Sequence, residues 1–237
     1  MKFSAYVVQA PRIEFGPMPA SFLARSWAAL AIAAALAVAF AAWAIVPRQA
    51  DLRAFDPIRM ARAETALWRD YYDKRYFALF QGLYVINRDE FDFSPLDSFR
   101  LSLWAASAAR KFQHTVSREE AGRALPDLQN YYAILAQGAH HPVNSELAAK
   151  LELDWWQARR ENVAPEVYGE TIAKAASELY GVNADRLVQS GVLRAKAMQY
   201  RDQHGEHMTD ADWAAVDDQL RAAYLALKQQ VAQPRSA

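Results

Sequence analysis

Apolar residues along the chain form one unbroken run near the N-terminus and then a series of shorter stripes with helical spacing. The run covers Ser26 to Val46, 21 residues without a charged side chain, and arginines flank it. A helix of this length, rising about 1.5 Å per residue, crosses a hydrocarbon core of about 30 Å. Trp27 and Trp43 lie near its ends, and indole rings favour membrane interfaces. The pattern predicts a short basic tail over residues 1–25 and a single transmembrane helix over residues 26–46 that binds the bilayer.

A cleaved signal peptide is the alternative interpretation of this run. Ala42-Trp43-Ala44 fits the small-x-small pattern of a cleavage site. However, the 25 residues before the run are long for the basic leader of a signal peptide. The run also exceeds the roughly 7 to 15 residues of a signal peptide's apolar region. We therefore expect a signal anchor that stays attached, with cleavage as the open alternative.

Positive charges near the run point to two different orientations. More arginines follow the run than precede it, and a simple count would place the C-terminal domain in the cytoplasm. Long translocated domains are largely exempt from that rule, whereas a short basic tail obeys it. We expect a single-pass protein of the inner, or plasma, membrane whose soluble domain lies outside the cytoplasm. The opposite orientation is the alternative.

Residues 47–237 carry repeated start signals for helices and no alternating strand pattern. The signals are N-cap residues, prolines in the first turn and a capping box. They lie at Asp56-Pro57, Ser94-Pro95, Ser117, the connector 141–145, Pro165, Asn183 and Thr209. We expect the first helix to run on to about Val85, and the third to kink or break at Pro126. The sequence thus predicts an all-α soluble domain, an irregular bundle of about seven helices.

The last of these helices has the cleanest amphipathic pattern in the chain. Its apolar stripe comprises Trp213, Val216, Leu220, Tyr224, Leu227 and Val231. One hypothesis makes this stripe a partner helix through which the chain joins a larger envelope assembly. That hypothesis predicts a stripe that stays exposed in the monomer.

Composition excludes several classes of function. The 237 residues include 27 basic and 27 acidic side chains, so the chain offers no electrostatic footprint for nucleic acid. The absence of cysteine excludes disulfides, thiolate catalysis and cysteine-ligated metal centres. Phosphate loops, dinucleotide-binding glycine motifs, zinc-protease motifs and nucleophile elbows are also absent. We therefore predict no catalytic residue and no cofactor.

A weak metal candidate lies between the last two predicted helices. His204 and His207 stand close to carboxylates in the sequence, and two imidazoles with a carboxylate can bind a divalent ion. However, Gly205 and the Thr209 cap place both histidines in a connector of unspecified geometry. The competing interpretation is a polar loop with solvated histidines, and we predict no metal site.

Charged residues on otherwise apolar helix faces are the stronger candidates for a site. Glutamates, arginines and tryptophans share such faces at helical spacing on three helices. The six candidate ligand-binding residues are Glu64, Trp68, Glu152, Trp155, Arg159 and Arg194. If the faces converge, the two glutamates pair with the two arginines around a pocket where arginine would bind a carboxylate or a phosphate. The alternative is an ion-pair network that only fixes the register of the helices.

The missing catalytic motifs and the neutral charge favour an interaction or assembly module. Its anchor would confine the domain to the membrane plane and raise the effective concentration of a protein partner, or of a second copy of the chain. We expect such a module to tether partners at the inner membrane. The alternative is a domain that binds a small ligand, or an enzyme, at the Glu/Arg/Trp-lined pocket. An open cleft around the four charged groups would favour that alternative, and a closed, fully paired cluster would favour a scaffold.

Overall fold

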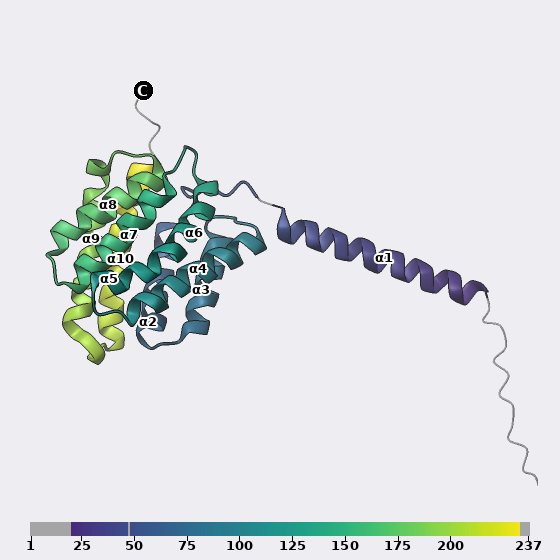
Figure 1. The fold of residues 1–237 in the computed structure, drawn as a ribbon, viewed down its shortest axis with the longest axis horizontal. Helices are drawn as coiled ribbons and strands as arrows, with labels where there is room; N and C mark the ends of the chain where they lie inside the picture. Colours follow the sequence, from purple (N-terminus) through teal and green to yellow (C-terminus); the bar gives the residue numbers. More distant parts are fainter. Residues whose placement is uncertain (1–19, 47, 233–237) are drawn as a thin grey trace, which may run out of the picture. The chain divides into compact units, whose positions relative to one another are not determined.

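The computed structural model describes residues 20–46 and 48–232, with side chains from Trp27 onward (Figure 1). The chain divides into one unit that ends at Ala42 and a second unit that begins at Trp43. The described residues form helices and no strand, which confirms the predicted all-α class.

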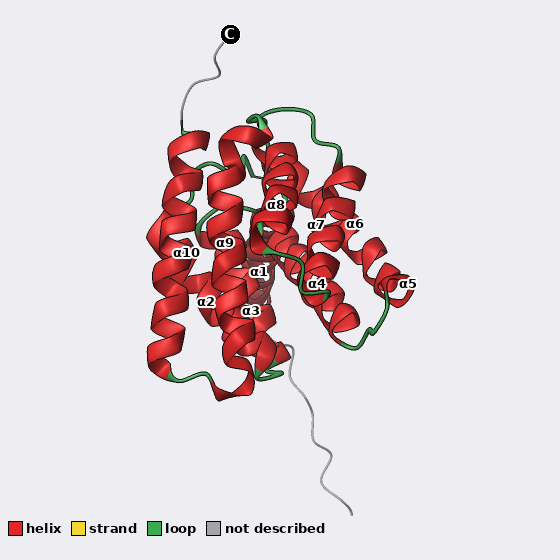
Figure 2. Ribbon diagram, turned by 90° about the vertical axis from the view of Figure 1, so that its left-hand side faces the viewer, coloured by secondary structure: helices red, strands yellow, loops and turns green. Residues whose placement is uncertain are grey.

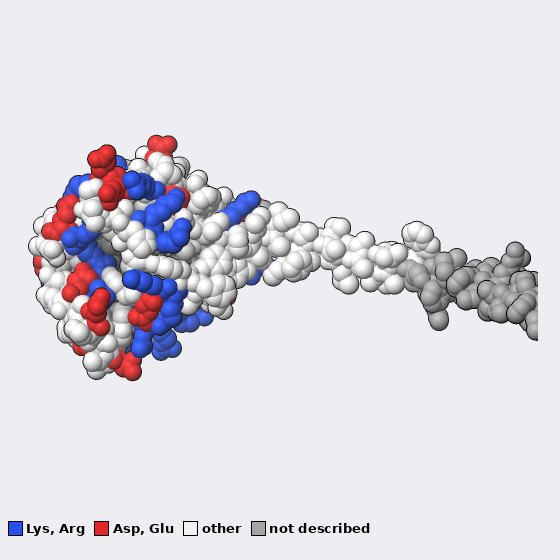
Figure 3. All heavy atoms as spheres, turned by 60° about the horizontal axis from the view of Figure 1, so that its bottom comes forward, with Lys and Arg blue, Asp and Glu red and all other residues white. Residues whose placement is uncertain are grey.

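Helix α1 (Ala20–Ile45) is long and apolar enough to cross a membrane. The candidate span is Trp27–Ile45, 19 residues, and none of it is buried. Figure 3 shows this part of the helix without acidic or basic side chains. By length and composition α1 is thus a candidate membrane span, and a signal sequence shares both properties.

The first predicted helix of the soluble domain is two helices, so the prediction of one long segment was wrong. α2 (Pro57–Tyr72) ends and α3 (Tyr76–Asp89) begins on either side of Lys74, whose φ is +57°. Across this turn the Arg75 backbone N–H donates to the Asp70 carbonyl at 2.8 Å. The turn contains neither glycine nor proline, which explains why the apolar pattern runs through it. The break lets α3 fold back and pack on α2.

The other predicted start signals are confirmed. The later helices are α4 (Pro95–Gln113), α5 (Arg118–Ala121), α6 (Leu125–Leu135), α7 (Ser145–Arg160), α8 (Pro165–Tyr180), α9 (Ala184–His204) and α10 (Asp210–Val231). Pro126 lies in the first turn of α6, and the third predicted helix is broken just before it. The side chains of Ser94, Asn144 and Thr209 accept hydrogen bonds from the first turns of α4, α7 and α10, as cap positions require.

The apolar stripe of α10 is buried against its neighbours. Figure 2 shows α10 beside α9, and α10 also packs on α2. Trp213 is 7% exposed, and Val216 and Leu220 are fully buried. The hypothesis of an exposed partner helix is therefore wrong, because α2 and α9 together cover the face that it needed.

Helices α8 and α9 approach each other at backbone distance. A Cβ added to Gly191 of α9 would lie 2.1 Å from the carbonyl oxygen of Gly169 in α8. A Cβ added to Gly169 would lie 2.7 Å from the Cα of Val192. Only hydrogen atoms fit between the helices here, so the two glycines set the helix separation. Arg194 follows Gly191 by less than one turn, and its position depends on this contact.

Replacing Gly191 with alanine is expected to destabilise the domain by about 1–3 kcal/mol, because the added methyl group overlaps the backbone of α8. The matched control is Gly122→Ala. Gly122 has a right-handed backbone conformation and no atom within 4 Å of an added Cβ, so its variant should keep the stability of the parent chain. The measurement is urea unfolding of the full chain in detergent micelles, followed by circular dichroism. Equal stability of the two variants would contradict the close approach of the helices.

Candidate functional site

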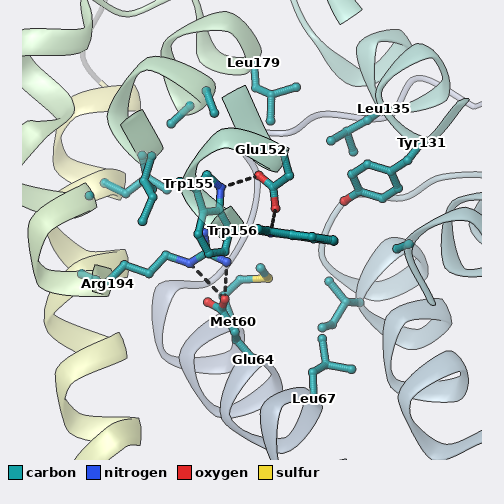
Figure 4. Close-up of a pocket in the computed structure, with 18 of the residues that line it drawn as sticks. Met60, Glu64, Leu67, Tyr131, Leu135, Glu152, Trp155, Trp156, Leu179 and Arg194 are labelled. Atoms are coloured by element: carbon teal, nitrogen blue, oxygen red, sulfur yellow. Dashed lines mark hydrogen bonds and ion pairs between the residues drawn. The ribbon is translucent and has the colours of Figure 1, made fainter. Parts of the chain in front are cut away.

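A cavity of about 380 Å³ lies inside the second unit. Side chains of every helix from α2 to α10 except the short α5 line it, and most of them are apolar. The six predicted ligand-binding residues all line this cavity: Glu64, Trp68, Glu152, Trp155, Arg159 and Arg194. Figure 4 shows the charged and indole groups of α2, α7 and α9 gathered on one side of it. The structure therefore brings the predicted residues to one place.

Glu64 and Arg194 form an ion pair between α2 and α9. Arg194 Nε donates to Glu64 Oε1 at 3.0 Å, and Arg194 Nη2 donates to the same oxygen. From α10, the Tyr224 hydroxyl donates to Glu64 Oε2 at 2.6 Å. Burial acts to lower the pKa of Arg194, but Glu64, Tyr224 and Glu152 together raise that pKa above its ordinary value. The predicted pairing of a glutamate with an arginine is thus confirmed for these two residues.

Glu152 makes no ion pair among the described residues, contrary to the predicted pairing. Three uncharged donors hold its carboxylate instead. The Tyr132 hydroxyl and the Trp155 indole N–H donate to Oε2, each at 2.9 Å. The Trp156 indole N–H donates to Oε1 at 3.0 Å. The two tryptophans follow Glu152 by three and four positions on α7, so both indoles reach back over one helical turn.

Arg159 is engaged by Asp202 of α9 rather than by a glutamate, which corrects the second predicted pairing. Arg159 Nε and Nη2 donate to the two carboxylate oxygens of Asp202 at 2.8 and 2.7 Å. Nη2 also donates to the Tyr72 hydroxyl. A second cavity of about 310 Å³ adjoins the first at this point. The lining residues common to both are Tyr71, Tyr72, Phe112, Trp156 and Arg159.

Several aromatic residues of the site were not among the six sequence candidates, and they include Tyr131, Tyr132, Trp156 and Tyr224. Figure 4 shows the Tyr131 hydroxyl pointing into the cavity, and no described residue forms a hydrogen bond with it. Burial raises the pKa of Tyr131 above its ordinary value, so this hydroxyl keeps its proton. The sequence carried one signal for these residues, namely the adjacent aromatic pairs that contain Tyr131 and Trp156. The bond from Tyr132 of α6 to Glu152 of α7 depends on how these two helices pack.

The two histidines proposed as weak metal candidates lie at the end of α9 and in the turn after it. His204 Nδ1 is 2.8 Å from the Tyr200 carbonyl oxygen, and His204 Nε2 is 3.6 Å from Asp212. His207 is exposed in the turn 205–207. Within the described residues no three His, Asp or Glu side chains gather closely enough to hold a metal ion.

The arrangement limits what the cavity can hold. Its mainly apolar wall suits a molecule with an apolar body, and its volume lies in the lower part of the range for small-ligand pockets. Both arginines already pair with carboxylates. Glu152 and Tyr131 are among the polar groups of the wall with spare hydrogen-bonding capacity. Comparison of the chain with protein-family models, with curated proteins and with solved structures finds no match.

The Arg194→Met variant is expected to lose about 3–5 kcal/mol of stability, because it leaves the Glu64 charge unpaired inside the domain. The double variant Glu64→Gln/Arg194→Met should recover part of that loss, since it removes both charges. Arg118→Met is the control: its ion pair with Glu161 is exposed, and water screens it, so the loss should be far smaller. Urea unfolding of the full chain measures all three. A double variant less stable than Arg194→Met would contradict the buried pair.

Proposed function

We propose that the helical domain binds a small, largely apolar molecule in the 380 Å³ cavity, and that α1 holds this binding domain at the inner membrane. The observation that carries the proposal is the convergence of charged and aromatic side chains from α2, α7 and α9 on a single cavity. Ligand pockets combine apolar walls with a few convergent polar groups in this way.

The cavity itself argues against a purely structural role for the charged residues. Protein interiors are close-packed, and voids larger than a water molecule are few. An ion-pair network that only fixed helix register would not need a space of this size beside it. A bound molecule would restore the missing contacts between the surrounding helices.

The tethering of a protein partner, or of a second copy of the chain, remains a prediction. Burial of the α10 stripe removes the surface that we expected a partner helix to use. The ligand-binding proposal keeps the anchor, because confinement to the membrane plane places the cavity beside molecules that partition into the bilayer.

The anchor is tested in two steps. The full chain should stay in membranes after an alkaline carbonate wash, and Leu36→Arg should release it, because a charge at the centre of a span opposes insertion by about 2.5–3.5 kcal/mol. Leu36→Ile is the matched control. Added protease on intact spheroplasts should digest the chain to a short N-terminal fragment. Full protection would overturn the proposed orientation, and loss of an N-terminal tag would indicate cleavage.

Ligand binding is tested with three probes that share a phenyl body, namely phenethylamine, phenethyl alcohol and phenylacetate. At least one should bind the full chain in detergent micelles and raise its thermal unfolding midpoint, since a ligand that binds only the folded state stabilises it. Ala176 lines the cavity, so Ala176→Leu should fill the space and abolish the rise. Ala222→Leu, at an exposed position of α10, should leave it unchanged. A rise that persists in Ala176→Leu would place the binding elsewhere.

A further inference from the structure

Glu152 is the charged residue of the cavity wall that lacks a charged partner in the described part of the chain. Glu64 is paired with Arg194, and Arg159 with Asp202. Glu152 instead accepts hydrogen bonds from one phenol and two indoles, none of which carries a charge. Glu152 is half-buried, and a carboxylate that has lost part of its hydration gains from a cationic partner. The Glu152 charge helps to raise the pKa of Arg194, but Arg194 is bonded to Glu64, and no described residue forms an ion pair with Glu152.

The hydrogen bonds of Glu152 leave one position free. An ionised carboxylate accepts at about four lone-pair sites, two on each oxygen. Oε2 uses both of its sites, for Tyr132 and Trp155. Among the residues that the structure describes, only Trp156 donates to Oε1. A ligand that donates an N–H to Oε1 would complete the set.

The aromatic groups around Glu152 also suit a cation. The guanidinium carbon of Arg194 lies 5.2 Å from the centre of the Trp155 ring, so this part of the wall already holds one positive group against an indole. The Trp156 ring lies nearly perpendicular to that of Trp155, with ring centres 6.0 Å apart. The faces of indole and phenol rings attract cations. The free hydroxyl of Tyr131 can accept a further hydrogen bond from the same ligand.

We propose that the ligand of this cavity carries a protonated amine, which donates a hydrogen bond to the free position of Glu152 Oε1 while its apolar body fills the rest of the space. This inference rests on the proposed function. A carboxylate or phosphate head group would face Glu152 and would have to compete with Glu64 and Asp202 for the two arginines. An alcohol could use the same position, but its hydrogen bond would lack the charge.

The three phenyl probes have similar apolar bodies and different head groups. They therefore compare an amine, an alcohol and a carboxylate directly. Titration calorimetry of the full chain in micelles at neutral pH should show phenethylamine binding about tenfold or more tightly than phenethyl alcohol, as a charge-assisted hydrogen bond implies. Phenylacetate should bind least. Phenethyl alcohol or phenylacetate binding as tightly as phenethylamine would overturn the amine inference and leave the cavity proposal standing. Failure of all three to bind would overturn both.

Substitution of Glu152 is a second test of the proposed amine ligand. Glu152→Gln keeps the shape but removes the charge, so the affinity for phenethylamine should fall about tenfold while that for phenethyl alcohol stays within about threefold. Glu146→Gln, at an exposed position of the same helix, should change neither. An equal fall for both probes would overturn the role of the charge. Should Glu152→Gln not fold, Tyr131→Phe keeps the carboxylate and should weaken phenethylamine binding alone.

Discussion

The pairing of Glu64 with Arg194 is the interaction on which the arrangement of the domain depends. The two residues are 130 positions apart in the sequence, and Tyr224, which completes the cluster, is 160 positions from Glu64. Either charge left alone in this buried place would cost several kcal/mol. Any register of α2, α9 and α10 that separates the two charges would carry this cost. Glu152 of α7 lines the same cavity beside this cluster.

Local signals allowed most of the fold to be predicted from the sequence, and the exception has a physical reason. Ser94, Ser117 and Thr209 accept hydrogen bonds from within their own first turns, so their effect needs no distant residue. The break at Lys74 depends on a lysine in a left-handed conformation. A lysine rarely adopts that conformation, and no turn-forming residue marks the position.

For the candidate site too, the sequence predicted features that depend on local spacing and missed those that depend on how distant helices pack. Charges on apolar faces identified six of the residues that line the cavity and the pairing of Glu64 with Arg194, but not the partners of Glu152 and Arg159. The indole contacts of Glu152 could have been derived from spacing, since they span three and four positions of one helix. The bond from Arg159 to Asp202 could not, because it spans 43 positions and depends on how α7 and α9 pack. The size of the cavity likewise follows from packing.

Arg159 bears on how fast a ligand would exchange rather than on how tightly it would bind. It lies where the two cavities adjoin, bonded to Asp202 of α9 and to Tyr72 of α2. If the ligand of the proposed function enters through the second cavity, Arg159 lies on its path, whereas the amine proposed above would contact Glu152. The rate of exchange and the selectivity are then set by different residues. Substitution at Asp202 would thus alter how long a ligand stays without altering which ligand is chosen.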